Sequence, residues 1–311
     1  MRTVAVIGAS GRQGGAQVRQ LSKAGFAVKA LSRSEDPFYG EDKPANVEVV
    51  PADLYDHDSL VKAFDGAEAV FHTHPLRARA DRAAIAGAVG KAANEAGVKR
   101  VVWNTSSWIP DRPGDAFTYA GNTAGINALW RSGVGATVFG SVLFMDNLLT
   151  NWARPFIVNE GRFVYAHKPT TEANWISLDD VARIMIHSLD RPDMEGAWMN
   201  IGGPERLRPG QLADSLSSVL GREIRYDACS PAEFGCHLVS AYGDEMGPEE
   251  AEVMAKGIGD FYEYNINSPT RPFEVDTDEM LRRIPIELET FADWAKRQDW
   301  RNTNAKRPPA G

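Results

Sequence analysis

The chain has 311 residues, of which 43% are hydrophobic and 24% charged, with a formal net charge of −8. This is the composition of an ordinary globular domain, and the length is enough to bury a core without disulfide or metal staples. The acidic balance argues against non-specific binding to nucleic acid or to an anionic membrane surface. No apolar run approaches the length of a membrane span, and we expect no signal peptide. The two cysteines, Cys229 and Cys236, match no zinc-site spacing, so a reducing, cytoplasmic location is expected.

Short apolar segments rich in β-branched residues alternate with helical patterns through the first half of the chain. The expected strands are 3–8, 26–33, 46–54, 67–75, 99–107 and 136–144. Helices are expected from about 13 to 25, over 56–64, from about 80 to 96 and from about 119 to 131. This rhythm predicts an α/β fold with right-handed crossovers and a doubly wound parallel sheet of the Rossmann type.

The regular alternation of strands and helices ends at about residue 150, after which helical segments follow one another with fewer strands. The region 172–190 predicts a segment leading into a helix capped by aspartate, and 197–203 predicts a further strand. We therefore expect a nucleotide-binding domain over 1–150, with sheet contributions from 171–205, and a smaller α/β substrate lobe over 151–302. Residues 303–311 are expected to be disordered.

The first strand runs into a glycine-rich turn, "VIGASGRQGG", that opens the first helix. Gly8 permits the tight turn, Gly11 lets backbone N–H groups approach a pyrophosphate, and Gly14 lets the helix pack close to the sheet. Ser10 adds a hydroxyl donor, and the helix begins near Gln13, so its positive end faces the anion. The strand–turn–helix context predicts a dinucleotide site rather than an unrelated glycine-rich turn.

The tip of the second strand selects the nucleotide. An NAD site places an acidic residue there for the ribose 2′-hydroxyl, but this chain has Ser32 and Arg33. Arg12 projects from the glycine turn, and two guanidinium groups suit a 2′-phosphate. The pattern favours NADPH over NADH, although Glu35 and Asp36 follow closely and keep NADH as the second choice.

Further cofactor contacts are expected where the third and fourth strands end. Asp53 follows the third strand, where it is placed to meet the adenine amino group, and Leu54 lies beside it. Thr73 lies at the end of the fourth strand, which borders the nicotinamide half of the site.

The sequence resembles the NmrA-like branch of the atypical short-chain dehydrogenases. The resemblance rests on "VIGASGRQGG", the "LSR" tip, "PADLYDHDSLVKAFDGAEAVF", "AANEAGVKRVVWNTSS", "FMDNLL", "ISLDDVARI" and "NIGGPERL". It covers nearly the whole chain to about residue 235, and the rest more faintly. It implies a Rossmann domain with a smaller C-terminal substrate lobe. The family includes quinone and dye reductases and non-catalytic redox sensors, so the resemblance leaves the function open.

Short-chain dehydrogenases use a tyrosine as proton donor with a lysine four residues later, and this pair is broken here. Counted from Tyr119, the lysine position holds Thr123; counted back from "LWRSGV", it holds Asn122 and the tyrosine position holds Thr118. Tyr119 and Asn122 share a helix face, so we expect Asn122 to bind ribose hydroxyls and Tyr119 to line the pocket. Without a neighbouring cation a tyrosine is a weak acid at neutral pH, which favours acceptors that hold negative charge well.

Other candidate side chains follow the fourth and fifth strands. Ser106 and Ser107 end the fifth strand, where the family places a substrate-facing hydroxyl, although a turn or cap role is also open. His72 and His74 lie two residues apart and point to one face of the fourth strand. We predict no metal site there, because no third ligand is clear. His74 is a second candidate acid, because an imidazole titrates near neutrality, and a structural histidine is the simpler interpretation.

Apolar side chains near the strand ends predict a flat, apolar substrate. With Ser107, the expected lining residues are Trp108, Phe144, Met145 and Trp175, and core packing is the alternative for them. The first hypothesis is therefore an NADPH-dependent reductase of a small conjugated or aromatic carbonyl or quinone, with Tyr119, His74 and Ser106 as catalytic candidates. The second is a non-catalytic NADP(H) sensor that regulates a protein partner. Either form is expected to be a monomer or a homodimer.

Overall fold

The computed structural model describes residues 1–33, 36–38, 43–75, 78, 80–111, 116–241 and 246–301; the segment 303–311, expected to be disordered, lies outside the described residues. Its largest sheet has seven parallel strands in the order β10-β6-β5-β4-β1-β2-β3. These strands are β1 (Thr3–Ile7), β2 (Ala27–Ser32), β3 (Val47–Pro51), β4 (Ala69–Thr73), β5 (Arg100–Asn104), β6 (Gly135–Ser141) and β10 (Trp198–Ile201). The predicted doubly wound Rossmann-type sheet is confirmed.

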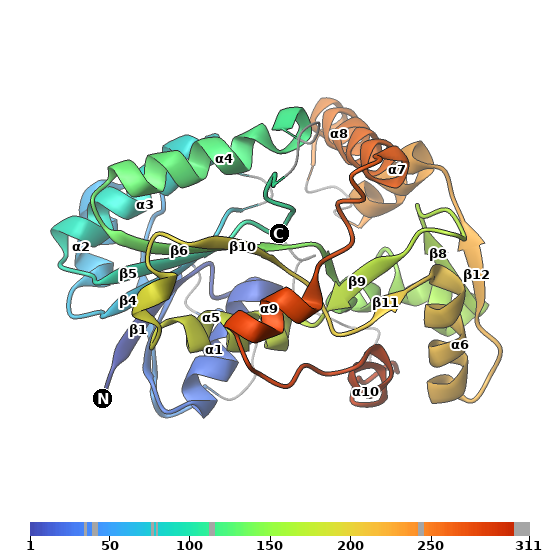
Figure 1. Ribbon diagram of the computed structural model, residues 1–311, viewed down its shortest axis with the longest axis horizontal. Coiled ribbons are helices and arrows are strands. Elements are labelled where there is room, and N and C mark those ends of the chain that lie inside the picture. Colours follow the sequence, from blue (N-terminus) through green and yellow to red (C-terminus); the bar gives the residue numbers. More distant parts are fainter. Residues whose placement is uncertain are drawn as a thin grey trace.

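Helices cover both faces of this sheet (Figure 1). One face carries α1 (Arg12–Lys23) and α5 (Leu178–Ser188), and the other carries α2 (His57–Phe64), α3 (Arg82–Glu95) and α4 (Ala116–Arg131). Alternate residues of β1 serve the two faces: Val4 and Val6 pack on the α1 side, and Ala5 and Ile7 on the other. All four side chains are buried, as expected for a strand covered on both sides.

The chain leaves the seven-stranded sheet after β6 and returns to it with β10. The intervening and following segments build two small sheets and a further group of helices. The sheets are β7 (Leu143–Phe144) with β9 (Ala173–Ile176) and β11 (Arg206–Leu207), and β8 (Arg162–Tyr165) with β12 (Arg225–Ala228). The helices are η1 (Met145–Leu149), η2 (Phe156–Glu160), η3 (Pro192–Met194), α6 (Pro209–Leu220), α7 (Pro231–Ser240), α8 (Pro248–Asn267), α9 (Thr277–Arg283) and α10 (Phe291–Lys296). A domain boundary at residue 150 stays a prediction.

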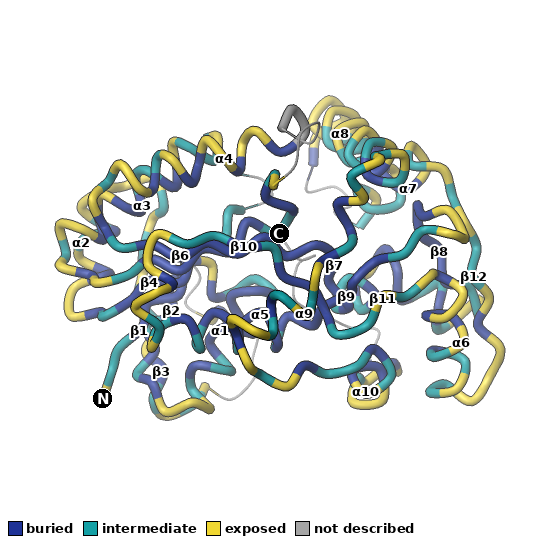
Figure 2. Tube along the Cα trace, viewed as in Figure 1, coloured by how far each residue is buried: buried dark blue, intermediate teal, exposed yellow. Residues whose placement is uncertain are grey.

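We call the two small sheets, with η1, η2, α6, α7, α8 and α10, the second lobe; its aromatic side chains form a buried cluster, which Trp108 and Tyr119 also join. Tyr165 lies at its centre, with ring centroids 4.6 Å from Phe234, 5.1 Å from Trp175 and 5.9 Å from Trp152. Such tilted and edge-on pairs add to the free energy gained from burying the rings. Figure 2 shows this buried interior flanked by the exposed outer faces of α6, α7 and α8.

Two helix starts differ from the sequence-based expectation. The cap of α5 is Ser177, whose hydroxyl accepts a hydrogen bond from the Asp180 N–H at 3.1 Å, rather than an aspartate. This leaves Asp179 and Asp180 in the first turn, where carboxylates oppose the positive end of the helix dipole. The other difference is α4, which begins at Ala116, three residues before Tyr119.

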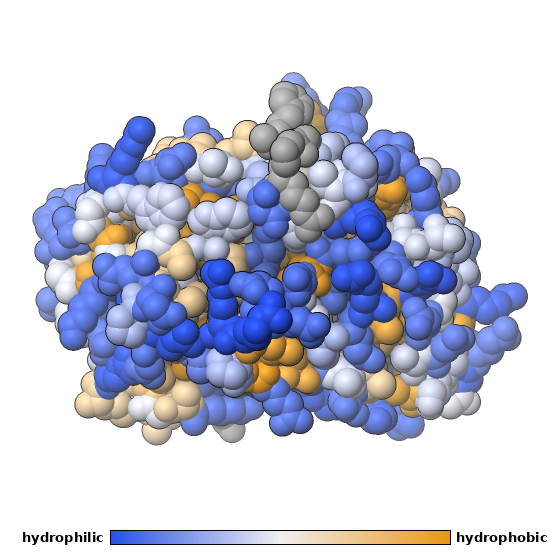
Figure 3. Space-filling model, viewed as in Figure 1, coloured by the Kyte–Doolittle hydropathy of each residue, from blue (hydrophilic) through white to orange (hydrophobic). Residues whose placement is uncertain are grey.

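The visible surface is mainly hydrophilic. On the face shown in Figure 3, apolar side chains form small separate patches among polar ones. Among the helices of the described segments, none is long and apolar enough to cross a membrane.

Candidate functional site

The glycine turn between β1 and α1 has the geometry that a dinucleotide pyrophosphate requires. Gly8 has a φ of +70°, a conformation that favours glycine. A Cβ on Gly14 would lie 2.1 Å from the carbonyl oxygen of Gly8, so the helix and the turn approach closely only because no side chain is present. Gly11 is the N-cap of α1 and gives it no side-chain cap, an arrangement found where helix N-termini bind phosphate groups.

The other predicted cofactor residues lie along the same carboxyl edge of the sheet. The turn is fixed to β2 by a hydrogen bond of 3.2 Å from the Ala9 N–H to the Leu31 carbonyl, directly before Ser32 and Arg33. Ser32 is buried and Arg33 is exposed. The remaining members are Ser10 in the turn, Asp53 and Leu54 after β3, and Thr73 at the end of β4.

Arg12 extends toward the second lobe. Its Nη2 donates to the carbonyl oxygen of Leu149, in η1, at 3.3 Å. The guanidinium also acts on the half-buried Asp146 carboxylate of the same short helix, where it opposes the rise in pKa that burial causes. The residue therefore connects the glycine turn to the second lobe, a contact that the sequence did not indicate.

A closed hydrogen-bond network connects the start of α1 to the end of β5. The Gln13 amide donates to the Ser106 hydroxyl at 2.9 Å and accepts from the Asn104 amide at 2.7 Å. The Asn104 carbonyl oxygen in turn accepts from the Ser106 N–H at 3.1 Å and from the Ser141 hydroxyl at 2.7 Å. Ser106 has a φ of +60°, which is uncommon for a residue with a side chain, so the network holds its hydroxyl in one place.

A cavity of about 1120 Å³ opens at this edge, between the strand ends and helices α7 and α8. The polar residues at the strand ends and at the starts of α1 and α3 form what we call the polar end: Gln13, His74, Asp81, Arg82, Ser106 and Ser107. Asn147, Glu249 and Glu250 also line the cavity. Apolar side chains form the opposite wall, among them Phe144, Trp152, Val253, Met254, Ile258 and Phe261. A cavity with a few convergent polar groups and a broad apolar wall is typical of a site for a small organic ligand.

Tyr119 lies away from the cavity. It is buried, its hydroxyl donates to the side-chain carbonyl of Asn265 in α8, and its ring packs edge-on against Phe261 and Tyr264. It is not among the residues that line the cavity. The expectation that Tyr119 lines the pocket is therefore wrong, because α8 covers this face of α4.

Asn122, one turn further along α4, points toward the strand ends. Its amide donates to the Ser107 hydroxyl at 2.9 Å and to the carbonyl oxygen of Trp108 at 2.7 Å. Its own carbonyl oxygen is buried and has no hydrogen-bond partner among the described residues. Asn122 thus fixes Ser107, which lines the cavity, while Asn122 itself does not line it, and its predicted contact with ribose hydroxyls stays a prediction.

His74 lines the cavity as a neutral side chain. Burial and the charge of Arg82 lower its pKa to about 4, although Asp81 acts in the other direction. Its predicted suitability as an acid that titrates near neutrality is therefore wrong.

His72 is fully buried, and the centroid of its ring lies 5.7 Å from that of Trp103. Its pKa is lowered to about 3, mainly by burial. Within the described ranges, no group of three or more His, Cys, Asp or Glu side chains is placed to hold a metal ion.

The predicted lining residues divide into two groups. Ser107 lines the cavity, and Phe144 both lines it and packs in the buried core beneath the sheet, so lining and core packing both hold for Phe144. Trp108, Met145 and Trp175 are buried in the core of the second lobe and do not line it, so the core-packing alternative holds for these three.

Sequence reasoning missed Asn104, Arg82 and the cavity face of α8. Met254, Ile258 and Phe261 recur at the helical spacing i, i+4, i+7, a signal that was present in the sequence. That signal shows an apolar helix face but not the surface that the face covers.

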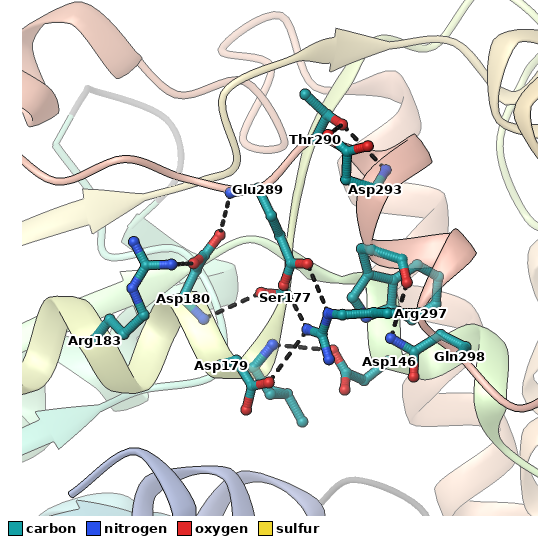
Figure 4. Close-up of polar contacts among 12 residues, drawn as sticks. Asp146, Ser177, Asp179, Asp180, Arg183, Glu289, Thr290, Asp293, Arg297 and Gln298 are labelled. Atoms are coloured by element: carbon teal, nitrogen blue, oxygen red, sulfur yellow. Dashed lines mark hydrogen bonds and ion pairs between the residues drawn. The ribbon is translucent and has the colours of Figure 1, made fainter. Parts of the chain in front are cut away.

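A cluster of carboxylates and arginines joins α5 to the C-terminal segment (Figure 4). Arg297 pairs with Glu289 at 2.5 Å and with Asp179 at 3.2 Å, and Arg19 of α1 pairs with Asp179 at 3.2 Å. Asp180 accepts from the Glu289 N–H at 2.9 Å. The cluster therefore connects the segment that contains Glu289 and Arg297 to α5, and α5 to α1.

Comparison with known proteins agrees with this geometry. The chain is 30% identical to the NAD(P)H azoreductase of Xenophilus azovorans over 226 residues, which are 72% of this chain and 76% of that protein. The triphenylmethane reductase of Citrobacter sp. complexed with NADP(H) superposes with a TM-score of 0.71 at 21% identity, covering 94% of this chain and 99% of that one. Nmra, a negative transcriptional regulator in complex with NAD, gives a TM-score of 0.73 at 18% identity, covering 96% and 98%. Residues 1–292 match the family model, so this protein belongs to the NmrA-like family.

Proposed function

We propose that this protein is an NAD(P)H-dependent reductase that transfers hydride to a planar conjugated or aromatic acceptor, such as a quinone. The observation that carries this proposal is the cavity, whose polar end begins at Gln13 in the first turn of α1, directly after the glycine turn. A dinucleotide with its pyrophosphate on that turn reaches this end of the cavity with its nicotinamide half. The apolar wall then faces the nicotinamide across the cavity.

The residues present fit a dinucleotide of the NADP type. At Gly14 the first turn of α1 packs directly against the Gly8 carbonyl, where a Cβ would clash, and α1 has no side-chain cap. Ser32 and Arg33 would bind the 2′-phosphate, Asp53 and Leu54 would border the adenine, and Thr73 and Asn122 would contact the nicotinamide half. When bound, the reduced nicotinamide supplies the hydride.

The polar end of the cavity orients the acceptor but holds no strong acid. Ser106 is fixed by Gln13, and Ser107 by Asn122, so both hydroxyls are ready to hydrogen-bond an acceptor oxygen or nitrogen. His74 is neutral at pH 7, and the Tyr119 hydroxyl is bound to Asn265 outside the cavity. This arrangement suits acceptors whose reduced form carries negative charge well, because they need little proton transfer at the moment of hydride transfer.

The relatives support the same class of acceptor. One is named for azo reduction with NAD(P)H and another for reduction of triphenylmethane dyes with NADP(H), and both names describe extended aromatic compounds. A cytoplasmic location and a monomeric or homodimeric state stay predictions from the sequence.

The second candidate is an NADP(H) sensor that reports cofactor binding to a protein partner. It is favoured by the missing lysine of the Tyr-x-x-x-Lys pair, whose position is held by Thr123 or Asn122 depending on the register, and by the structural neighbour that is a transcriptional regulator. A sensor needs the cofactor site but no acceptor site.

Turnover with a panel of quinones and azo dyes separates the two candidates. The assay is the loss of reduced-nicotinamide absorbance, with Gly14→Ala as a matched control that keeps the cavity and disturbs the cofactor turn. We expect acceptor-dependent oxidation of NADPH by the wild type and its loss in the variant. Tight NADPH binding with no turnover on any acceptor would refute the reductase and favour the sensor.

A further inference from the structure

Arg82 places a positive charge at the polar end of the cavity. It is the first residue of α3, lines the cavity and is half-buried. Its side chain crosses α4 at Gly121, where a Cβ would lie 3.5 Å from the Arg82 Cδ and 3.8 Å from its Nε. These are ordinary van der Waals distances, so the Arg82 side chain lies against α4 at this point.

The guanidinium has no partner of its own. Within the part of the chain that the structure describes, Arg82 makes no hydrogen bond or ion pair, and the only influence on its pKa is burial, which lowers it. Arg100, at the start of β5, shows the usual structural role by contrast: it donates to the carbonyls of Ser188 and Arg191 at 2.9 Å and pairs with Glu195 at 3.2 Å. A partly desolvated cation without an anion is unfavourable, so such a residue points to a ligand that supplies the anion.

The groups around Arg82 do not neutralise it. His74 is uncharged, because burial and Arg82 itself lower its pKa. Asp81 also lines the cavity, but it is exposed and its carboxylate caps α3 by accepting the Ala84 N–H at 2.7 Å. Glu249 and Glu250 also line the cavity but are exposed in the first turn of α8, where water screens their charges.

We propose that Arg82 binds an anionic substituent of the acceptor, a sulfonate or carboxylate group, while the apolar wall holds the planar body of the same molecule. This proposal rests on the proposed reductase function, because it names the substrate class of that site. The planar guanidinium donates two parallel hydrogen bonds to such a group, which a lysine cannot do. The predicted substrates are therefore aromatic acceptors with an acidic substituent.

Equilibrium binding tests the anion site without turnover. The probes are naphthalene-2-sulfonate and its neutral analogue naphthalene-2-sulfonamide, titrated by calorimetry into the protein loaded with NADP⁺. We expect the wild type to prefer the sulfonate by at least about tenfold, which corresponds to one charge-assisted hydrogen bond. Arg82→Gln should remove the preference, Arg82→Lys should keep part of it, and Arg131→Gln, which removes an exposed charge at the end of α4, should leave it unchanged.

Equal affinities for the two probes in the wild type would overturn the proposal, and so would a preference that persists in Arg82→Gln. Thermal unfolding of each variant checks that it is folded. The wild-type comparison and Arg82→Lys keep the test decisive if Arg82→Gln does not fold.

Turnover with 1,4-naphthoquinone-2-sulfonate and with 1,4-naphthoquinone separates this proposal from the proposed function. Arg82→Gln should raise KM for the sulfonated quinone by about 10- to 100-fold. The same variant should change KM for the unsubstituted quinone by less than about threefold. An equal fall in kcat for both quinones would overturn the proposed anion site. Arg82 would then stabilise negative charge that develops during the reaction, and not a charged substituent of the acceptor. Binding of the sulfonate through Arg82 with no reduction of any acceptor would refute the reductase and leave the anion site standing.

Discussion

Replacement of Asp146 by asparagine should stabilise the protein above neutral pH. The Asp146 carboxyl is half-buried in η1, where it accepts a hydrogen bond of 2.9 Å from the Leu178 N–H. Burial raises its pKa from 3.8 to about 6, and Asp179 acts in the same direction, while Arg12 and Arg297 oppose the rise. At pH 8 the folded protein therefore carries a half-buried charge that its surroundings do not fully compensate.

The size of the effect follows from proton linkage. The folded state binds the proton of Asp146 up to about pH 6, whereas the unfolded chain releases it near 3.8. Between these values the folded state holds more protons, so this group's contribution to the free energy of unfolding falls as the pH rises. A difference of about two pKa units corresponds to roughly 3 kcal/mol at pH 8, and the difference disappears below about pH 4.

Chemical denaturation at several pH values measures this contribution. Asp146→Asn keeps an acceptor for the Leu178 N–H and carries no charge, so we expect a gain of up to about 3 kcal/mol at pH 8 and almost none at pH 4. Asp179→Asn is the matched control. Burial acts to raise the Asp179 pKa, but Arg19, the Gln20 side chain and Arg297 together lower it, so this variant should be destabilised near neutral pH.

The reasoning about Asp146 is refuted if Asp146→Asn is less stable than the wild type at pH 8. It is also refuted if the two proteins lose stability in parallel between pH 4 and pH 8. Asp180 has a raised pKa of about 6 as well, mainly through burial, and it titrates in both proteins, so its effect cancels in the comparison.

Three further outcomes test the cofactor site and α4. Gly14→Ala should weaken NADPH binding at least about tenfold in a fluorescence titration, because the new Cβ would lie 2.1 Å from the Gly8 carbonyl oxygen and displace the turn. An unchanged affinity for NADPH would contradict the proposed phosphate site. Arg33→Gln should reduce the preference for NADPH over NADH about tenfold in the same titration, and equal affinities of the wild type for both would contradict the choice of NADPH. Tyr119→Phe should lower the free energy of unfolding by about 1–2 kcal/mol, because the side-chain carbonyl of Asn265 loses its hydrogen-bond donor. It should change kcat by less than about threefold. A large fall in kcat with normal stability would instead indicate that Tyr119 takes part in the reaction.

The sheet and the cofactor turn could be predicted because their signals are local. Runs of β-branched residues, the spacing of Gly8, Gly11 and Gly14, and the serine and arginine after the second strand each depend on a few neighbouring residues. Right-handed crossovers then place helices on both faces of such a sheet.

The walls of the cavity could not be predicted because they depend on contacts between distant residues. Tyr119 and Asn122 do lie on α4 as expected, but the side of α4 that faces the cavity is decided by Asn265, which follows Tyr119 by 146 residues. Trp108 and Phe144 illustrate the same limit. Both are apolar residues near strand ends, and only the packing of the second lobe determines that Trp108 is core alone while Phe144 also lines the cavity.

The size and polarity of the cavity bear on the choice between reductase and sensor. A cavity of about 1120 Å³ exceeds the roughly 300–1,000 Å³ of an ordinary small-molecule site, so it has room for the nicotinamide end of a cofactor and for a second molecule. A protein that only reports cofactor binding gains nothing from an open apolar wall, since exposed apolar surface lowers solubility. It also gains nothing from a partly buried Arg82 without a partner, because desolvation of that charge destabilises the fold. Both features are explained by one aromatic, anionic acceptor bound beside the nicotinamide, and its reduction then needs no acid stronger than water or a neutral imidazole.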